Sequence, residues 1–226
     1  MTETSAVTID IVSDVMCPWC YIGQKRLERA MEQVADVPVT INWRPYQLDP
    51  TLPPEGKDRK TYLAEKFGGE ERARSLYENV RQAGVSEGVA FAFDKIAVSP
   101  NTLDAHRLLR WAGSSGDGVQ NKLARRLFQL YFEEGANIGD HAVLIDAARD
   151  VGMDVSIVES LLPTDADRDK VTEEIATAQR MGVTGVPCFL LEGRYAVVGA
   201  QDTSVLADAI RKISEAKAKG ELDADG

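Results

Sequence analysis

The pattern of apolar and polar positions divides the chain into two outer parts that contain strands and a long central part that is helical. Residues 7–12 are apolar and largely β-branched, which predicts a buried strand. Apolar residues then recur at helical spacing over 18–34, and a second strand is expected at 37–43. A strand, a helix and a parallel strand in close succession predict a βαβ unit with a right-handed crossover.

The central part, from residue 58 to residue 162, has helical periodicity and no strand alternation of its own. Asn101, Asp140 and Asp154 stand where side chains cap helix N-termini. Residues 89–96 are apolar and aromatic and predict an extended connection or a short strand. The expected helices are 60–67, 70–83, 101–111, 119–134, 140–152 and a short one that ends before Pro163.

The last part repeats the character of the first. A helix over 165–181 precedes strands at 188–191 and 195–198, which a Glu192-Gly193 turn joins into a hairpin. A closing helix covers 203–217, and 221–226 are expected to fray. The order β-α-β … α-β-β-α predicts an α/β, thioredoxin-like fold with an all-helical inserted subdomain. Residues 1–55 and 165–226 would form one discontinuous domain, and 56–164 the insertion.

Charge and composition narrow the functional classes. The formal net charge of −10 argues against nucleic acid or an anionic membrane as partner. No apolar run approaches the roughly 18 residues that span a bilayer. The first residues lack the positive and apolar regions of a secretory signal, so a cytoplasmic location is expected. Three cysteines cannot form a structural disulfide framework, which favours a reactive role for the close pair.

The candidate chemistry lies in Met16-Cys17-Pro18-Trp19-Cys20-Tyr21, between the first strand and the first helix. Pro18 suits the first helical position, which makes Cys17 the N-cap. Unpaired backbone N–H groups and the helix dipole favour an anion there, so the Cys17 thiol should ionise more readily than a free one. Cys20, one turn on, can attack a mixed disulfide and release it. The spacing therefore predicts thiol–disulfide exchange.

With these residues the chain resembles the DsbA family of thiol oxidoreductases, and within it the FrnE-like branch. The matching segments are 13–23, 45–50, Asn101-Thr102 with His106, and 182–187. The resemblance implies that Cys17 attacks, that Cys20 resolves, and that Pro187 is a cis-proline facing the pair. It also implies that the backbone of Val186 pairs with an extended substrate peptide.

One departure from the family affects the predicted direction of the reaction. DsbA carries Pro-His between its cysteines, and that histidine helps to hold the thiolate, whereas this chain has Trp19 there. The Cys17–Cys20 pair is therefore expected to be a weaker oxidant than the cysteine pair of DsbA, which favours a reductase or isomerase activity. The expected partners are a disulfide-containing protein or a small thiol or disulfide. No cofactor is expected beyond the redox-active disulfide, with glutathione possible as co-substrate, and the chain could be a monomer or a homodimer.

Several residues have both a structural and a functional interpretation. Asp14 could accept hydrogen bonds within its turn or take a proton from Cys20, and the turn role is favoured. Cys188 is expected to be a small buried apolar residue, the alternative being a third redox thiol. Trp19, Tyr21 and Phe189 could line a substrate groove. His106 is expected to be a hydrogen-bonded core or interface residue.

Three rival functions remain open at this stage. The first is zinc binding, in which the CxxC pair would supply two ligands and Cys188, His106 and His141 are the further candidates. Pro-Trp between the cysteines favours redox chemistry and no metal. A glutathione-dependent isomerase or transferase of the same fold is a second, although such enzymes typically have serine at the first cysteine position. A non-catalytic peptide-binding or chaperone module is the third.

Overall fold

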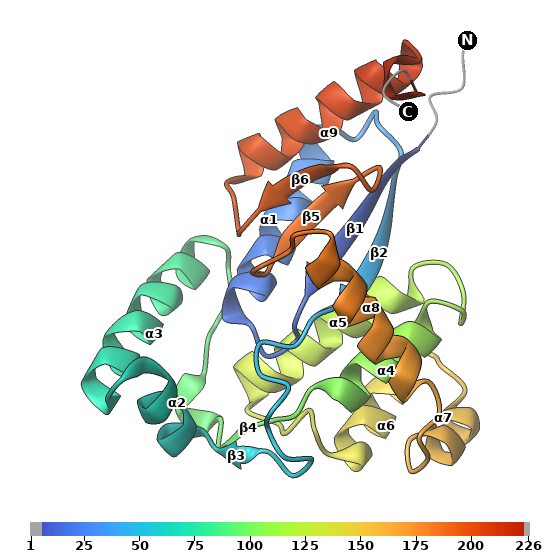
Figure 1. Cartoon of the computed structure of the whole chain (residues 1–226). Helices are drawn as coiled ribbons and strands as arrows, with labels where there is room; N and C mark the ends of the chain where they lie inside the picture. Colours follow the sequence, from blue (N-terminus) through green and yellow to red (C-terminus); the bar gives the residue numbers. More distant parts are fainter. Residues whose placement is uncertain (1–5, 224–226) are drawn as a thin grey trace.

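The computed structural model describes residues 6–223 and has a four-stranded mixed sheet with helices on both faces (Figure 1). The strand order is β2-β1-β5-β6. β1 pairs in parallel with β2, while β1 with β5 and β5 with β6 are antiparallel. The predicted thioredoxin-like arrangement is thus confirmed. The strands are β1 (Val7–Ser13), β2 (Val39–Pro45), β5 (Cys188–Leu191) and β6 (Tyr195–Val198).

Alternate residues of the central strands pack into different cores on the two faces of the sheet. On one face, Ile9 and Ile11 belong to the main core with α1 (Pro18–Gln33) and α9 (Thr203–Ala218), which pack against each other. The opposite face is covered by α8 (Arg168–Arg180). The smaller core there contains Val12, Ala178, Val183, Cys188 and Leu190. This two-sided burial follows from the period of two along a strand.

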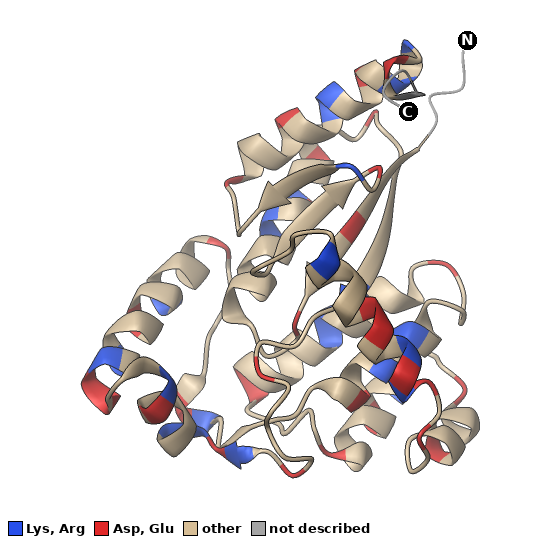
Figure 2. Cartoon of the chain, viewed as in Figure 1, with Lys and Arg blue, Asp and Glu red and all other residues tan. Residues whose placement is uncertain are grey.

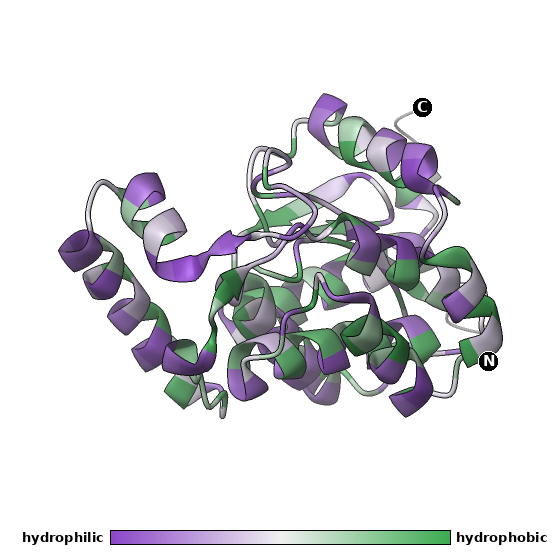
Figure 3. Cartoon of the chain, turned by 90° about the horizontal axis from the view of Figure 1, so that it is seen from below, coloured by the Kyte–Doolittle hydropathy of each residue, from purple (hydrophilic) through white to green (hydrophobic). Residues whose placement is uncertain are grey.

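Between β2 and α8 the chain forms most of its helices, and aspartates begin three of them as N-caps. Asp58 accepts from the N–H of Thr61, Asp140 from that of Ala142, and Asp154 from that of Ser156. The helices are α2 (Arg59–Phe67), α3 (Glu70–Ser86), α4 (Leu103–Ala112), α5 (Val119–Gln129), α6 (His141–Asp150) and α7 (Val155–Leu161). Figure 3 shows that α2 and α3 form a hairpin that projects from the rest of the molecule.

The prediction that this region is purely helical is wrong in one respect. A small antiparallel ladder joins β3 (Lys57–Asp58) to β4 (Val98–Ser99). Strands of two residues are too short to show an alternation of apolar and polar positions in the sequence. Residues 89–96 form no strand; they contain a 3₁₀ turn, Phe93–Lys95, and contribute aromatic rings to the core. Their apolar character therefore reflects side-chain burial and not strand pairing.

Three helix boundaries also differ from the predicted ones. α4 begins at Leu103, and Asn101 still accepts from the Leu103 N–H at 3.0 Å although Thr102 is the N-cap residue. The helix expected over 119–134 changes after α5 into a π-helical turn, Leu130–Glu134. α8 begins only at Arg168, because Asp167 before it has a left-handed backbone conformation. Of the tail 221–226, residues 221–223 form a 3₁₀ turn, and 224–226 lie outside the described residues.

Charged residues lie mainly along the outer helices and are sparse on the four-stranded sheet (Figure 2). In the described range 6–223, no helix combines the length and the apolar character that a bilayer crossing requires. Over the same range, no group of three or more histidine, cysteine, aspartate or glutamate side chains is placed to hold a metal ion.

Candidate active site

Cys17 stands at the start of α1, where the sequence predicted it. It is the N-cap residue with an extended backbone, and Pro18 occupies the first turn. The Cys17 carbonyl accepts from the N–H groups of Cys20, at 3.1 Å, and Tyr21, at 3.4 Å. Cys17 and Cys20 are both free thiols, and their side chains lie next to each other. The local geometry suits the formation of a disulfide between neighbours one turn apart.

A loop before β5 faces this pair from the other half of the chain. The Val186–Pro187 peptide bond is cis. The Cys17 thiol donates to the Val186 carbonyl, with 3.8 Å between Sγ and oxygen. Val186 is half-buried, whereas Pro187 is buried. The Pro187 carbonyl accepts from Gly199 N–H at 2.8 Å, which ties the loop to the sheet. Residues 17 and 186, distant in sequence, therefore meet at one site.

Burial distinguishes the cysteines from the tryptophan between them. Cys17 is 4% exposed and Cys20 1%, while Trp19 is 39% exposed. Burial, with the hydrogen bond and the charge of the neighbouring Cys17, raises the pKa of the Cys20 thiol well above its ordinary value. The Ser13 hydroxyl and the Asp14 backbone N–H oppose that rise in pKa, because both can donate to the sulfur. The surroundings of Cys20 thus disfavour its thiolate form.

Asp14 is fully buried in the turn that precedes Cys17. One carboxylate oxygen accepts from the N–H of Leu48 at 2.7 Å, and the other accepts from the N–H of Met16 at 3.3 Å. The Asp14 carbonyl also accepts from Cys17 N–H at 2.9 Å. The predicted role as a turn acceptor is what the contacts of this side chain describe. Its contact with Cys20 is made by the backbone N–H.

Two of the residues suggested for a substrate groove are instead in the core, so that suggestion is wrong for them. Phe189 is 0% exposed and Tyr21 is 1% exposed. The Tyr21 ring stacks on Phe128 with centroids 5.2 Å apart, and its hydroxyl donates to Glu133 at 2.6 Å. Burial and the hydrogen bond to Glu133 raise the pKa of Tyr21. Trp19 alone of the three presents a large apolar surface to solvent.

Cys188 lies on the other side of the sheet from the reactive pair. Its side chain belongs to the small core under α8, opposite Val12 in the ladder, whereas Cys17 and Cys20 belong to the main core. Burial raises the pKa of the Cys188 thiol. These surroundings match the expected role of a small buried apolar residue.

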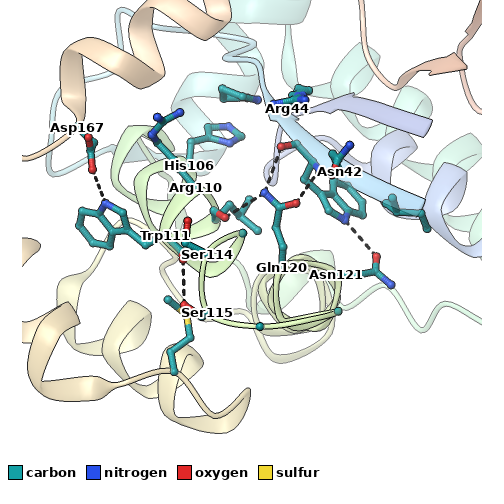
Figure 4. Close-up of a pocket in the computed structure, with 18 of the residues that line it drawn as sticks. Asn42, Arg44, His106, Arg110, Trp111, Ser114, Ser115, Gln120, Asn121 and Asp167 are labelled. Carbon is teal, nitrogen blue, oxygen red and sulfur yellow. Dashed lines mark hydrogen bonds between the residues drawn. The ribbon is translucent and has the colours of Figure 1, made fainter. Parts of the chain in front are cut away.

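A cavity of about 770 Å³ lies beside the site, between β2, α4, the 113–118 loop, α7 and α8 (Figure 4). Ser13 and His106 line it, but neither cysteine of the pair does. Several polar side chains that line the cavity already have hydrogen-bond partners. Gln120 accepts from the Trp43 N–H and donates to the Trp43 carbonyl, and Trp111 donates to Asp167 at 2.9 Å.

His106 was expected to be a core or interface residue, but the sequence did not indicate that it lies next to Asp14. It comes from α4, is 3% exposed, and its Nε2 lies 3.5 Å from the Asp14 carboxylate. The two residues are 92 positions apart along the printed sequence, so no spacing rule connects them. The only signal was its place in the Asn101-Thr102 segment that resembles the family.

Gly23 tests the contact between α1 and the Pro187 loop. A Cβ at Gly23 would lie 2.9 Å from Pro187 Cγ and 3.2 Å from Phe189 Cζ. Gly23→Ala should therefore push the loop away from Cys17 and lower stability by about 1–3 kcal/mol. Urea unfolding measures this loss of stability. Gly185→Ala is the stability control, because its Cβ meets no atom within 4 Å; equal stability of the two variants would contradict the close packing.

Comparisons with known proteins agree with this geometry. A family model described as a DSBA-like thioredoxin domain matches residues 8–211. A probable DsbA oxidoreductase of Streptomyces coelicolor is similar in structure, with 30% identity, a TM-score of 0.82 and coverage of 92% of this chain and 89% of that one. The uncharacterized protein YwbO of Bacillus subtilis is 27% identical over 90% of this chain and 96% of its own length.

A more distant solved structure has the same fold. It is the cytosolic disulfide reductase DsbM of Pseudomonas aeruginosa with GSH. DsbM is 21% identical to this chain, with a TM-score of 0.59 and coverage of 94% of this chain and 99% of DsbM.

Proposed function

Because the chain belongs to the family of DSBA-like thioredoxin domains, we propose that it is a dithiol–disulfide oxidoreductase acting through Cys17 and Cys20. The observation that carries the proposal is the contact of two free thiols at a helix N-terminus, opposite the Val186–Pro187 loop. A helix N-terminus favours the anionic form of a sulfur, and the thiolate is the nucleophile in disulfide exchange.

The reaction has two steps whose atoms balance. The Cys17 thiolate attacks one sulfur of a substrate disulfide, forming a mixed disulfide and releasing the other sulfur as a thiolate that takes up a proton. Cys20 then loses its proton and attacks Cys17 Sγ, closing the Cys17–Cys20 disulfide and releasing the second substrate thiol. The substrate gains two electrons and the pair loses two.

The substrate contacts are proposed from the residues around Cys17. Since Cys17 is only 4% exposed, a disulfide reaches its sulfur when a neighbouring group moves aside. Two candidates are Trp19, which is exposed and lies two positions after Cys17, and Val186, which is half-buried and contacts Cys17 from across the site. An extended peptide would pair with the Val186 backbone, with Pro187 holding that backbone toward Cys17.

We propose that the protein reduces substrate disulfides and that it acts in the cytoplasm. Trp19 supplies no charge to hold the Cys17 thiolate, and a thiolate that is less stabilised makes the disulfide form less oxidising. DsbM, with the same fold, is a cytosolic disulfide reductase whose structure includes GSH. Glutathione is accordingly the proposed reductant that returns the pair to its dithiol state, with no other cofactor.

Cys20→Ser tests whether Cys17 attacks the substrate and Cys20 resolves the mixed disulfide. With glutathione as reductant, insulin reduction should fall sharply, because a serine at position 20 cannot resolve the mixed disulfide. When the reduced variant is mixed with insulin in the absence of glutathione, it should accumulate as a disulfide adduct with insulin through Cys17, which non-reducing mass spectrometry detects. Full turnover by Cys20→Ser would contradict the two-step scheme.

The same variant separates the rival functions. If Cys20→Ser kept a glutathione-conjugating activity, a glutathione-dependent isomerase or transferase would be favoured, since such chemistry needs no second thiol. If a variant with both cysteines replaced still prevented aggregation of an unfolded protein, a non-catalytic chaperone would be favoured.

A further inference from the structure

The polar residues beneath Cys20 are buried and incompletely hydrogen-bonded. Asp14 is 0% exposed, Ser13 2% and His106 3%. The Ser13 hydroxyl lies near the Cys20 sulfur and makes no hydrogen bond in the described part of the chain. His106 Nε2 makes no hydrogen bond within the same residues, although it lies 3.5 Å from Asp14 Oδ1. Buried polar groups without partners are rare in native proteins, which points to a functional role for this cluster.

The cluster matters because Cys20 must become an anion in a buried place. A buried thiolate needs hydrogen-bond donors, and the two at hand are Ser13 Oγ and the Asp14 backbone N–H. The same turn positions Cys17, whose N–H donates to the Asp14 carbonyl at 2.9 Å. The orientation of residues 13 and 14 therefore controls how well the Cys20 sulfur is supported when it attacks.

His106 is the side chain placed to fix that orientation. No lysine or arginine nitrogen lies within 4 Å of the Asp14 carboxylate in residues 6–223, and His106 is its ionisable partner there. The backbone of His106 is fixed in the first turn of α4, where its N–H donates to the Thr102 carbonyl at 3.0 Å. At 3.5 Å from a carboxylate oxygen, Nε2 must carry hydrogen to be attracted to it.

We propose that His106 is a positioning residue for Cys20: its Nε2–H holds the Asp14 carboxylate, so that the Asp14 N–H and the Ser13 hydroxyl meet the Cys20 sulfur during resolution of the mixed disulfide. This role rests on the proposed disulfide exchange and concerns its second step alone. In that step the Cys20 S–H bond and the Cys17–substrate S–S bond break, the Cys17–Cys20 bond forms, and the proton ends on the released substrate thiol.

The cavity beside the site makes this role testable by chemical rescue. His106 lines a space of about 770 Å³, and Figure 4 shows it on the cavity wall near Arg110. Truncation of His106 to alanine leaves room for a free imidazole to enter from the cavity and take the place of the ring.

The experiment follows one turnover with oxidised glutathione as the probe. Reduced protein is mixed with it, quenched in acid at set times, and analysed by mass spectrometry for the Cys17–glutathione adduct and the Cys17–Cys20 disulfide. For His106→Leu we expect adduct formation within about twofold of wild type but resolution about tenfold slower, because the buried Asp14 carboxylate loses the attraction of its ionisable partner. His106→Gln, which keeps a donor, should recover much of that loss, and imidazole should accelerate resolution by His106→Ala.

His141 provides the matched control. Its Nε2 lies 2.9 Å from Asp104 and its side chain is 39% exposed, so His141→Leu should resolve the adduct at the wild-type rate. Wild-type resolution by His106→Leu would overturn the role of His106, as would slow resolution that neither glutamine nor imidazole restores. If wild-type protein forms no adduct at all, the proposed disulfide exchange itself fails.

Discussion

Replacing Cys17 with serine is expected to reduce insulin reduction to below roughly a thousandth of the wild-type rate, because a serine hydroxyl without an adjacent general base is a weak nucleophile. Cys17 is the sulfur placed at the N-terminus of α1 and in contact with the Val186 carbonyl. The assay follows insulin precipitation with glutathione as reductant, on variants whose folding is checked by circular dichroism.

Cys188→Ser is the matched control for this substitution. Cys188 lies in the small core beneath α8, on the far side of the sheet. Its replacement should lower stability slightly and leave the rate per folded molecule unchanged. Activity that survives in Cys17→Ser but disappears in Cys188→Ser would reassign the attacking thiol.

Arg107→Met is expected to lower the free energy of unfolding by about 3–5 kcal/mol, since it removes a buried charge whose partners are left without donors. The Arg107 side chain is fully buried on α4 and donates to the Asp104 carboxylate. It also donates to four backbone carbonyls in the connection that leads from α7 to α8, those of Leu161, Leu162, Thr164 and Ala166. One guanidinium thus fixes the chain at the point where it returns to the sheet.

Urea unfolding measures the Arg107 effect, with two comparison variants. Arg107→Lys keeps the charge but lacks the planar fork of donors, so it should recover only part of the loss. Arg180→Met removes an arginine from the surface pair with Glu173, whose side chains are 60% and 68% exposed, and should change stability by about 1 kcal/mol or less. Equal losses for Arg107→Met and Arg180→Met would contradict the structural role of Arg107.

The outer strands and helices were predictable because their signals are local. Residues 7–12 and 188–191 are apolar runs bounded by turn residues, and Pro18 directly after Cys17 indicates where α1 begins. The Glu192-Gly193 turn was equally readable, and both residues have the positive φ values that such a hairpin turn requires. Local chemistry was therefore enough for the sheet and for the reactive pair.

What the sequence did not indicate depends on contacts between distant segments. Arg107 carries a charge and is nevertheless fully buried, although charged residues are mostly exposed. His106 was expected to be a core or interface residue, but its position beside Asp14 was not predicted. The partners that stabilise them, Asp14 and the 161–166 carbonyls, become neighbours only in the folded chain. Tyr21 and Phe189 were assigned to a substrate groove for the same reason. An aromatic residue near a reactive site is equally consistent with a groove and with the core when only the sequence is known.

The most direct test of the account is the reduction potential of the Cys17–Cys20 couple, measured by equilibrating the protein with glutathione buffers and quantifying the two thiols by mass spectrometry. We expect a reversible two-electron transition between these cysteines, more reducing than the about −120 mV of DsbA, and absent when either cysteine is replaced. A chain that forms no Cys17–Cys20 disulfide at any glutathione ratio would contradict the account.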